Sequence, residues 1–204
     1  MTKVPYVTFM KHALKVTKSP TCKTRPVLGG VIHRDNYIAV TDSHRLYFAS
    51  DMYEGEEKNV DPKTGAEITE GNYPDVNRLL PVEGGEKASA KLNVDRITKA
   101  IKLIEQAGKI DKMSDIVSIE SDGSTFQFKT DENAQVYCEY FSEYGIEGDS
   151  FTMHASARYL SEGLSLIKEA GFEEATFNFY GSMRPFTIVA GNLTVLILPI
   201  RKAN

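Results

Sequence analysis

The sequence contains little cysteine and no long apolar segment, and each shortage excludes a class of protein. The two cysteines, Cys22 and Cys138, are far apart and have no further cysteine or histidine at metal-ligand spacing, so we expect two reduced thiols and no zinc site. The N-terminal apolar cluster "VPYVTFM" is interrupted by Pro5 and followed by Lys11, and it matches neither a signal peptide nor a membrane span. We therefore expect a cytoplasmic protein with no membrane partner, no metal and no cofactor.

An excess of positive charge is also lacking. The chain has 24 basic and 28 acidic residues and a formal net charge of −4, so a uniformly basic nucleic-acid surface is not expected. Any nucleic-acid surface must come from the way the basic residues are distributed. The rest of the composition, with 41% apolar and 25% charged residues, is ordinary for a globular protein, and 204 residues can form one large domain or two small ones.

Three segments have the apolar periodicity of amphipathic helices: residues 8–19, 93–108 and 156–171. Asn93 and Ser156 are placed to cap the second and third helices, and Gly108 and Gly171 are placed to end them. The third helix has a mixed polar face, whereas the outer faces of the first two are basic. These basic residues are Lys11, Lys15, Lys18, Arg96, Lys99 and Lys102.

Strand signals fill much of the remaining chain. Runs rich in β-branched and aromatic residues are separated by turn signals such as Asp122-Gly123 and Gly191-Asn192, which indicates an α+β fold with many antiparallel strands. The runs cover residues 25–35, 37–50, 115–121, 124–130, 134–144, 150–155, 174–181, 184–191 and 193–200.

The acidic, turn-rich segment of residues 54–74 shows no helical period, so we expect a hairpin or a linker there. We predict a domain boundary shortly after it, which gives two domains, residues 1–82 and 83–204. A strand, a helix and a run of strands occur after Val4, after Lys87 and after Ser150, which predicts one such unit in the first domain and two in the second.

The neighbouring residues Asp42, Ser43 and His44 contain the side chains of a catalytic triad. Consecutive side chains of an extended strand point to opposite faces, however, and a triad needs three groups that converge. The flanking "YIAV" and "LYFA" are strand-like, so we interpret the polar stretch as a turn or bulge between two strands with an architectural or recognition role. No nucleophile–base pair, phosphate loop or metal cluster was found elsewhere, and we expect no enzyme.

Six motifs occur in the same order as in the bacterial β sliding clamp, the processivity ring of DNA polymerase III: "TRPVLGGV", "AVTDSHRL", "GNYPDVNRLLP", "RYLSEGL", "GSMRPFTI" and "LILPIR". The sequence therefore resembles that family from Thr24 to Arg201. The resemblance implies a DNA-clamp fold with antiparallel sheets outside and amphipathic helices on one face. It also implies that the first domain corresponds to half of the clamp's middle domain and the second to its last domain, as in a shortened clamp of a phage or mobile element.

In the clamp family, the helices line a central hole and hold duplex DNA by its phosphates without reading the sequence. The resemblance thus implies double-stranded DNA as a partner, because mobile cations give binding that is independent of sequence and sensitive to salt. The alternative is that these cations are only the solvated faces of amphipathic helices. The candidate DNA-binding residues are Lys11, Lys15, Lys18, Arg25, Arg96, Lys99 and Lys102.

The resemblance also implies a hydrophobic pocket that captures a short linear motif of polymerases, clamp loaders and repair proteins. In this pocket, aliphatic side chains would bury the apolar anchors of the ligand, and the histidine, the arginines and backbone groups would bind its polar ends. The candidate pocket residues are Leu28, Thr41, Ser43, His44, Arg45, Leu46, Pro74, Arg78, Leu79, Ser156, Tyr159, Met183, Leu196, Ile197, Pro199, Ile200 and Arg201.

Two functions follow from these expectations. The first is a sliding-clamp-like processivity factor that encircles DNA as a homo-oligomer, because the half-domain would leave a sheet edge to be covered by another copy or a partner. The second is an adaptor or decoy that does not encircle DNA and uses the same pocket to compete for clamp-binding proteins.

Overall fold

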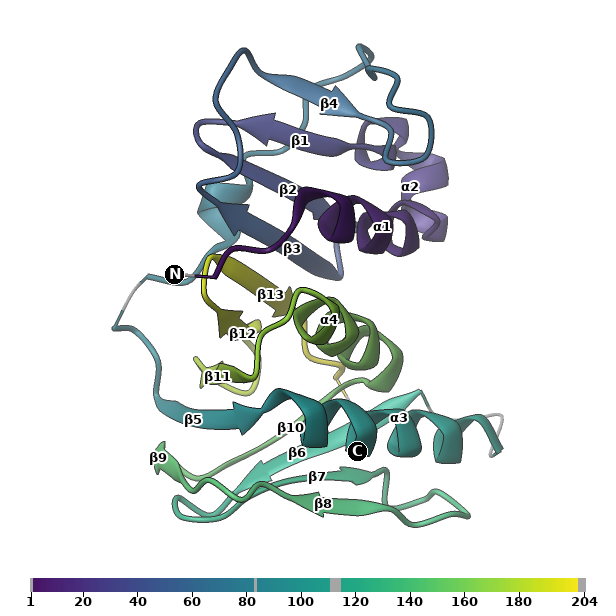
Figure 1. Ribbon diagram of the computed structural model, residues 1–204. Coiled ribbons are helices and arrows are strands. Elements are labelled where there is room, and N and C mark those ends of the chain that lie inside the picture. Colours follow the sequence, from purple (N-terminus) through teal and green to yellow (C-terminus); the bar gives the residue numbers. More distant parts are fainter. Residues whose placement is uncertain (1, 83, 111–114, 202–204) are drawn as a thin grey trace.

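The computed structural model describes residues 2–82, 84–110 and 115–201, and two antiparallel sheets form its frame (Figure 1). The larger sheet has nine strands in the spatial order β4 (Lys58–Val60), β1 (Val31–Arg34), β2 (Tyr37–Thr41), β3 (Arg45–Ser50), β13 (Leu193–Ile197), β12 (Phe186–Ala190), β11 (Glu174–Phe179), β5 (Ala88–Asn93) and β9 (Ile146–Gly148). The smaller sheet has the order β10 (Phe151–Ser156), β6 (Ile116–Ser121), β7 (Phe126–Thr130) and β8 (Glu139–Phe141).

Three long helices lie side by side along one side of the molecule (Figure 1). They are α1 (Tyr6–Thr17), α3 (Val94–Ile110) and α4 (Ala157–Glu169), and α4 contacts both of the others. Together with the antiparallel sheets, these helices confirm the predicted α+β fold. Shorter helical turns are α2 (Pro20–Thr24), η1 (Pro26–Gly29) and η2 (Val76–Leu79).

The helix ends follow local chemistry in most cases. Asn93 accepts a hydrogen bond from the Arg96 amide, and Ser156 accepts one from the Tyr159 amide, so both predicted N-caps are confirmed. Gly171 follows α4 with φ of 87°, a conformation that favours glycine after a helix. Gly108 does not end α3, because the helix continues to Ile110 with Gly108 buried in it.

The two halves of the chain are joined by strand pairing. β3 pairs with β13 over five residues, from Arg45 opposite Ile197 to Ala49 opposite Leu193. The helix-facing side of this joint belongs to the large apolar core that contains Phe9, Tyr47 and Val195. The opposite side has a smaller apolar cluster of Leu28, Ile32, Tyr37, Ala39, Leu46, Tyr73, Val76 and Leu196, and the candidate site lies beside it.

Some expected elements differ from the structure. Residues 2–5 form no strand before α1, and within the range 25–35 only β1 is extended because residues 26–29 form η1. α2, β4 and β9 had no clear sequence signal. Residues 54–74 contain β4 and a hairpin in which Val60 bridges to Glu67, so the outer edge of β4 is covered by its own chain.

The predicted domain boundary at residue 83 lies outside the described residues. Among the described helices, none is long and apolar enough to cross a membrane.

Candidate functional site

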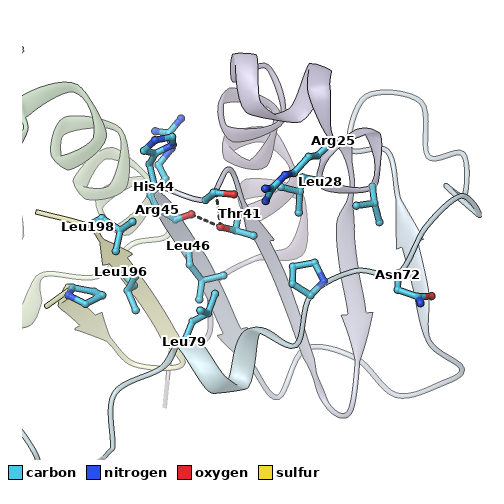
Figure 2. Close-up of a pocket in the computed structure, with 14 residues that line it drawn as sticks. Arg25, Leu28, Thr41, His44, Arg45, Leu46, Asn72, Leu79, Leu196 and Leu198 are labelled. Atoms are coloured by element: carbon cyan, nitrogen blue, oxygen red, sulfur yellow. Dashed lines mark hydrogen bonds between the residues drawn. The ribbon is translucent and has the colours of Figure 1, made fainter. Parts of the chain in front are cut away.

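A cavity of about 450 Å³ opens beside the joint between β3 and β13 (Figure 2). This volume lies within the range of small-ligand and peptide pockets. Its walls come from η1, the tip of the β2–β3 hairpin, the connector around η2, and the ends of β12 and β13. The lining residues are Arg25, Val27, Leu28, Thr41, Ser43, His44, Arg45, Leu46, Asn72, Pro74, Leu79, Pro185, Leu196 and Leu198.

The hairpin tip, residues 41–45, is held by its own polar groups. Thr41 Oγ1 donates to the Arg45 carbonyl at 2.7 Å and accepts from the Ser43 amide at 3.1 Å. The Asp42 carboxylate accepts from the amides of His44 and Arg45, each at 3.1 Å. Ser43 adopts φ of 72°, a conformation that a short polar residue tolerates in a turn. The polar stretch is therefore a tight turn, as the sequence predicted.

The same contacts explain why this stretch does not form a triad. The Asp42 carboxylate is bound to backbone amides and to the Arg45 guanidinium, whereas the His44 ring lies 3.2 Å from the Asp42 carbonyl. A triad would require the carboxylate to orient the imidazole. The turn instead presents His44 and Ser43 at the rim of the cavity.

Arg45 is the structural centre of the turn. Its guanidinium contacts the carboxylates of Asp42 and Glu162, and it stacks over the Tyr159 ring at 4.4 Å from the ring centroid. Burial lowers the pKa of Arg45, but Tyr47, Glu162 and Asp42 outweigh this effect and raise it, so the side chain stays charged. Arg45 is only 3% exposed. Its charge is thus already paired within the fold, and its contact with a ligand stays a prediction.

Nine of the predicted pocket residues line this cavity: Leu28, Thr41, Ser43, His44, Arg45, Leu46, Pro74, Leu79 and Leu196. They come from three separate parts of the chain, and Figure 2 shows the labelled leucines gathered around the opening. Leu79 is 47% exposed and Leu198 is 38% exposed, so apolar surface is available for a ligand. The arrangement suits an extended segment that inserts aliphatic or aromatic side chains.

The other predicted pocket residues do not line this cavity. Ile197 is fully buried in the core, and Ser156 is buried as the N-cap of α4, where its hydroxyl also bonds to Asp115. Arg78 is exposed and bonded to Asp75. Tyr159 lies behind the rim, with its ring centroid 6.3 Å from that of His44. Pro199 lies after β13 and is half-buried.

Met183, Ile200 and Arg201 line a second hollow, of about 500 Å³, on the four-stranded sheet. The Ile200 amide donates to the His154 carbonyl at 2.7 Å, so the end of the described chain runs along β10. The walls of this hollow include Glu120, Lys129 and His154, and it is more polar than the first. The predicted single wall is therefore divided between two hollows.

Sequence reasoning missed Val27, Asn72, Pro185 and Leu198 as lining residues. For Leu198 a signal existed, because side chains two apart on an extended chain share a face. Leu196 and Leu198 therefore face the cavity while Ile197 faces the core. Arg25, predicted as a DNA contact, lines the cavity directly after α2 (Figure 2), and its DNA contact stays a prediction.

The predicted basic stripes of α1 and α3 are exposed but partly neutralised. Lys11 pairs with Glu169, Lys99 pairs with Asp95 at 2.7 Å, and Arg96 lies 3.6 Å from Glu143. Lys15, Lys18 and Lys102 are exposed and have no ion pair among the described residues. The carboxylates of α4 and the first turn of α3 thus offset part of the basic charge.

Two exposed carboxylates link the three helices at the surface. Asp95 of α3 binds Lys99 and Lys168, and hydrogen bonds from these lysines lower the pKa of Asp95 to about 2. Glu169 of α4 binds Lys11 and His12 of α1, and hydrogen bonds from both lower the pKa of Glu169 to about 2. Among the described residues, no group of three or more His, Cys, Asp and Glu side chains is placed to hold a metal ion.

Solved structures with the same fold include bacterial sliding clamps. The beta subunit of a Streptococcus pyogenes DNA polymerase superposes with a TM-score of 0.79 at 18% identity, over 96% of this chain and 64% of that one. The DNA polymerase III beta subunit of Thermotoga maritima gives a TM-score of 0.78 at 16% identity, over 96% of this chain and 64% of that one. The Bacillus subtilis sliding clamp gives a TM-score of 0.76 at 19% identity, over 98% of this chain and 64% of that one. No family model and no curated protein matches the sequence.

The chain therefore has the DNA-clamp fold that its motifs implied, and it spans about 64% of the length of these clamps.

Proposed function

We propose that this protein is a shortened sliding-clamp-like processivity factor of DNA replication that performs no chemistry of its own. It holds duplex DNA through the cations of its helices and tethers partners through the cavity beside β3 and β13. In this proposal, residues 1–82 form a half-domain and connector, and residues 83–204 form a clamp domain. The observation that carries the proposal is the preformed apolar cavity on a clamp fold, with nine family-matched residues at its walls.

The proposed occupant of the cavity is the short linear motif of a polymerase, a clamp loader or another clamp-binding protein. A few aliphatic anchors in a preformed cleft give affinities of about −7 to −9 kcal/mol, which corresponds to micromolar binding and suits partners that exchange. His44 and Ser43 are placed to bind backbone groups of the motif, and the leucines to bury its side chains. A clamp of Helicobacter pylori has been solved in complex with diflunisal, so a clamp of this fold binds small molecules as well.

Lys15, Lys18 and Lys102 support the DNA part of the proposal, because they are exposed and unpaired among the described residues. Lys11, Arg96 and Lys99 are weaker candidates, since each has an ion-pair partner, although exposed pairs of this kind contribute only about 0 to 1 kcal/mol and can exchange for phosphate. Arg25 is assigned to the cavity. Encirclement would require several copies, because the described part of one chain contributes three long helices.

The second candidate is an adaptor or decoy that uses the cavity alone. The ion pairs of three of the seven candidate lysines and arginines favour it. Both candidates share the cavity, and they differ in DNA retention.

Fluorescence anisotropy with a labelled peptide that carries the clamp-binding motif of a replicative polymerase tests the cavity. Leu198→Ala removes part of the apolar wall and is expected to weaken binding about tenfold, or ~1.4 kcal/mol. Leu103→Ala, an equally conservative change of a leucine that is 65% exposed on α3, is the matched control and should leave the affinity unchanged. Equal affinities of the wild type and Leu198→Ala would disprove the cavity assignment.

A further inference from the structure

The second half of the chain contains two copies of one structural unit. One copy is β5, α3, β6, β7 and β8, and the other is β10, α4, β11, β12 and β13. We call the two copies sister units. The first strand of each unit joins the sheet of its sister: β10 pairs with β6, and β5 pairs with β11. The helices α3 and α4 also pack together. Each unit is thus completed by the other in a reciprocal way.

The first unit, residues 6–60, has the same plan but no sister. α1 covers β2 as α3 covers β7, and the sheet order β4-β1-β2-β3 repeats the order β10-β6-β7-β8. β4 therefore supplies, from the same chain, the strand that a sister would donate. In the second half, α4 lies beside α3 and contacts β10. No helix in the described part of the chain takes the equivalent place beside α1 on the β1 and β4 side.

α4 contacts α1 on the β3 side, opposite the β1 and β4 side, because the pairing of β3 with β13 brings α4 there. His12 and Lys11 of α1 point toward α4, where both bind Glu169. Tyr6, Met10 and Leu14 are spaced by four residues and form a separate stripe on the side away from these contacts. The Tyr6 hydroxyl lies 3.0 Å from Nε2 of His33, which fixes this stripe on the β1 side.

This stripe is apolar and open. Tyr6 is 44% exposed and the neighbouring Val7 is 78% exposed, while Met10 and Leu14 are half-buried. Two adjacent exposed apolar residues at the start of an amphipathic helix indicate a contact surface when they continue a stripe of this kind.

Opposite charges flank the two ends of the stripe. The turn of residues 51–57 lies beside the N-terminal end of α1, because the Tyr53 ring packs on His33 at 5.1 Å. It carries the exposed Glu54 and Glu56, while Glu57 pairs with Arg34 and Asp51 accepts a hydrogen bond from Asn36. The C-terminal end of α1 carries Lys15 and Lys18. In an antiparallel pair of α1 helices, the basic end of one copy meets the acidic turn of the other. The two-fold symmetry makes this contact occur twice.

We propose that the first unit is completed by the first unit of a second copy of this chain, with α1 packed against α1 across a two-fold axis. The pair then contains six of these units, three from the described part of each copy. The pairing surface goes beyond the proposed function, and it can be tested without DNA or peptide.

The experiment is the mass of the particle by size-exclusion chromatography with multi-angle light scattering. The wild type is expected to be a dimer or a tetramer, and Val7→Glu is expected to halve its mass, because the contact would then bury a carboxylate where the wild type buries an apolar side chain. Leu103→Glu, at a similarly exposed leucine on α3, is the control and should keep the α1 pair. A monomeric or trimeric wild type, or an unchanged mass for Val7→Glu, overturns the proposal.

A second measurement locates the contact directly. Val7→Cys in a Cys138→Ser background, treated with a short bis-maleimide, should give a covalent dimer, whereas Leu103→Cys in the same background should not give one through α1. Cys22 is buried and does not compete. Crosslinking of Leu103→Cys alone would place the contact on α3 and contradict the proposal. A circular dichroism spectrum of Val7→Glu that matches the wild type shows that the variant is folded. This control needs no peptide, so its outcome is separate from the fate of the cavity assignment.

Discussion

The guanidinium Nε of Arg45 lies 3.2 Å from the carboxylate of Asp42, and the two side chains are 2% and 0% exposed. Glu162 of α4 contacts the other side of the same guanidinium, so one buried cation ties the hairpin tip to the second half of the chain. Removing one partner of such a group leaves an uncompensated buried charge.

Arg45→Met keeps most of the apolar length of the side chain and removes the charge. We expect a loss of about 3 to 5 kcal/mol in the free energy of unfolding, measured by urea denaturation, because Asp42 is left buried and unpaired by a cation. The double variant Arg45→Met with Asp42→Asn should recover part of this loss. A single variant as stable as the wild type would show that the network contributes nothing to the fold.

His33 predicts a pH dependence of stability. Its Nδ1 lies 3.0 Å from the Val31 carbonyl, which can only accept, so Nδ1 carries the proton and Nε2 accepts from Tyr6. Burial lowers the pKa of His33, although the Val31 carbonyl opposes this effect. In the unfolded chain the imidazole takes up a proton near pH 6.5, while the folded chain does so only at lower pH. The free energy of unfolding therefore falls as the pH drops below about 6.5.

His33→Gln removes the contribution of His33 to the pH dependence of stability. Urea unfolding of the wild type and the variant at about pH 8 and about pH 5.5 should show that the wild type loses more stability on acidification. His12, whose pKa is also lowered by burial, is present in both proteins and cancels. The pKa of Glu169 is about 2, so its contribution to the free energy of unfolding is lost between about pH 4.5 and about pH 2, below the pH range compared. Parallel pH profiles for the two proteins would contradict the assignment.

The exposed lysines separate the two candidate functions. If they contact phosphates, Lys15→Glu with Lys102→Glu should weaken binding to a random-sequence duplex. It should also reduce the slope of log affinity against log salt by about 0.9 per lost contact. Lys63→Glu with Lys91→Glu, two exposed changes outside α1 and α3 that alter the charge by the same total, is the control for net charge. Equal DNA retention by the wild type and the double variant would favour the adaptor.

Gly163 allows α4 to approach β13. A Cβ built at this position would lie 2.7 Å from Cγ1 of Val195, which is closer than real contacts allow. Gly163→Ala should therefore destabilise the protein by about 1 to 3 kcal/mol, although alanine favours a helix by about 1 kcal/mol. Val195→Ala in the same chain makes room, so the double variant should be less destabilised than the sum of the single changes, as measured by thermal unfolding.

Several features of the fold could be predicted from the sequence because they depend on neighbouring residues. The apolar periods of the three helices, the caps at Asn93 and Ser156, and the turn at residues 41–45 are set by local hydrogen bonds and side-chain spacing. The end of α3 could not be predicted from Gly108, because tertiary burial of that glycine allowed the helix to continue.

The candidate site was predictable only in part. Leu46 and Leu196 were expected at one wall from family motifs, and both line the cavity. Arg201 belongs to the same motif as Leu196 but lies at the second hollow, since its position depends on how the end of the described chain runs along β10. Met183, in the turn between β11 and β12, also lies at the second hollow. Arg45 was expected to meet a ligand, and only the carboxylate of Glu162, distant in sequence, shows that its charge is already used.

By itself, the sequence determined the element types, the α+β class and the clamp-like order of motifs, because periodicity and turn chemistry act over a few residues. Only the tertiary structure decided the pairing of β3 with β13, the division of the predicted wall into two hollows, and the open side of α1. These features depend on the register and packing of segments far apart in the chain, and no local pattern records which distant partner a strand or a helix face will meet.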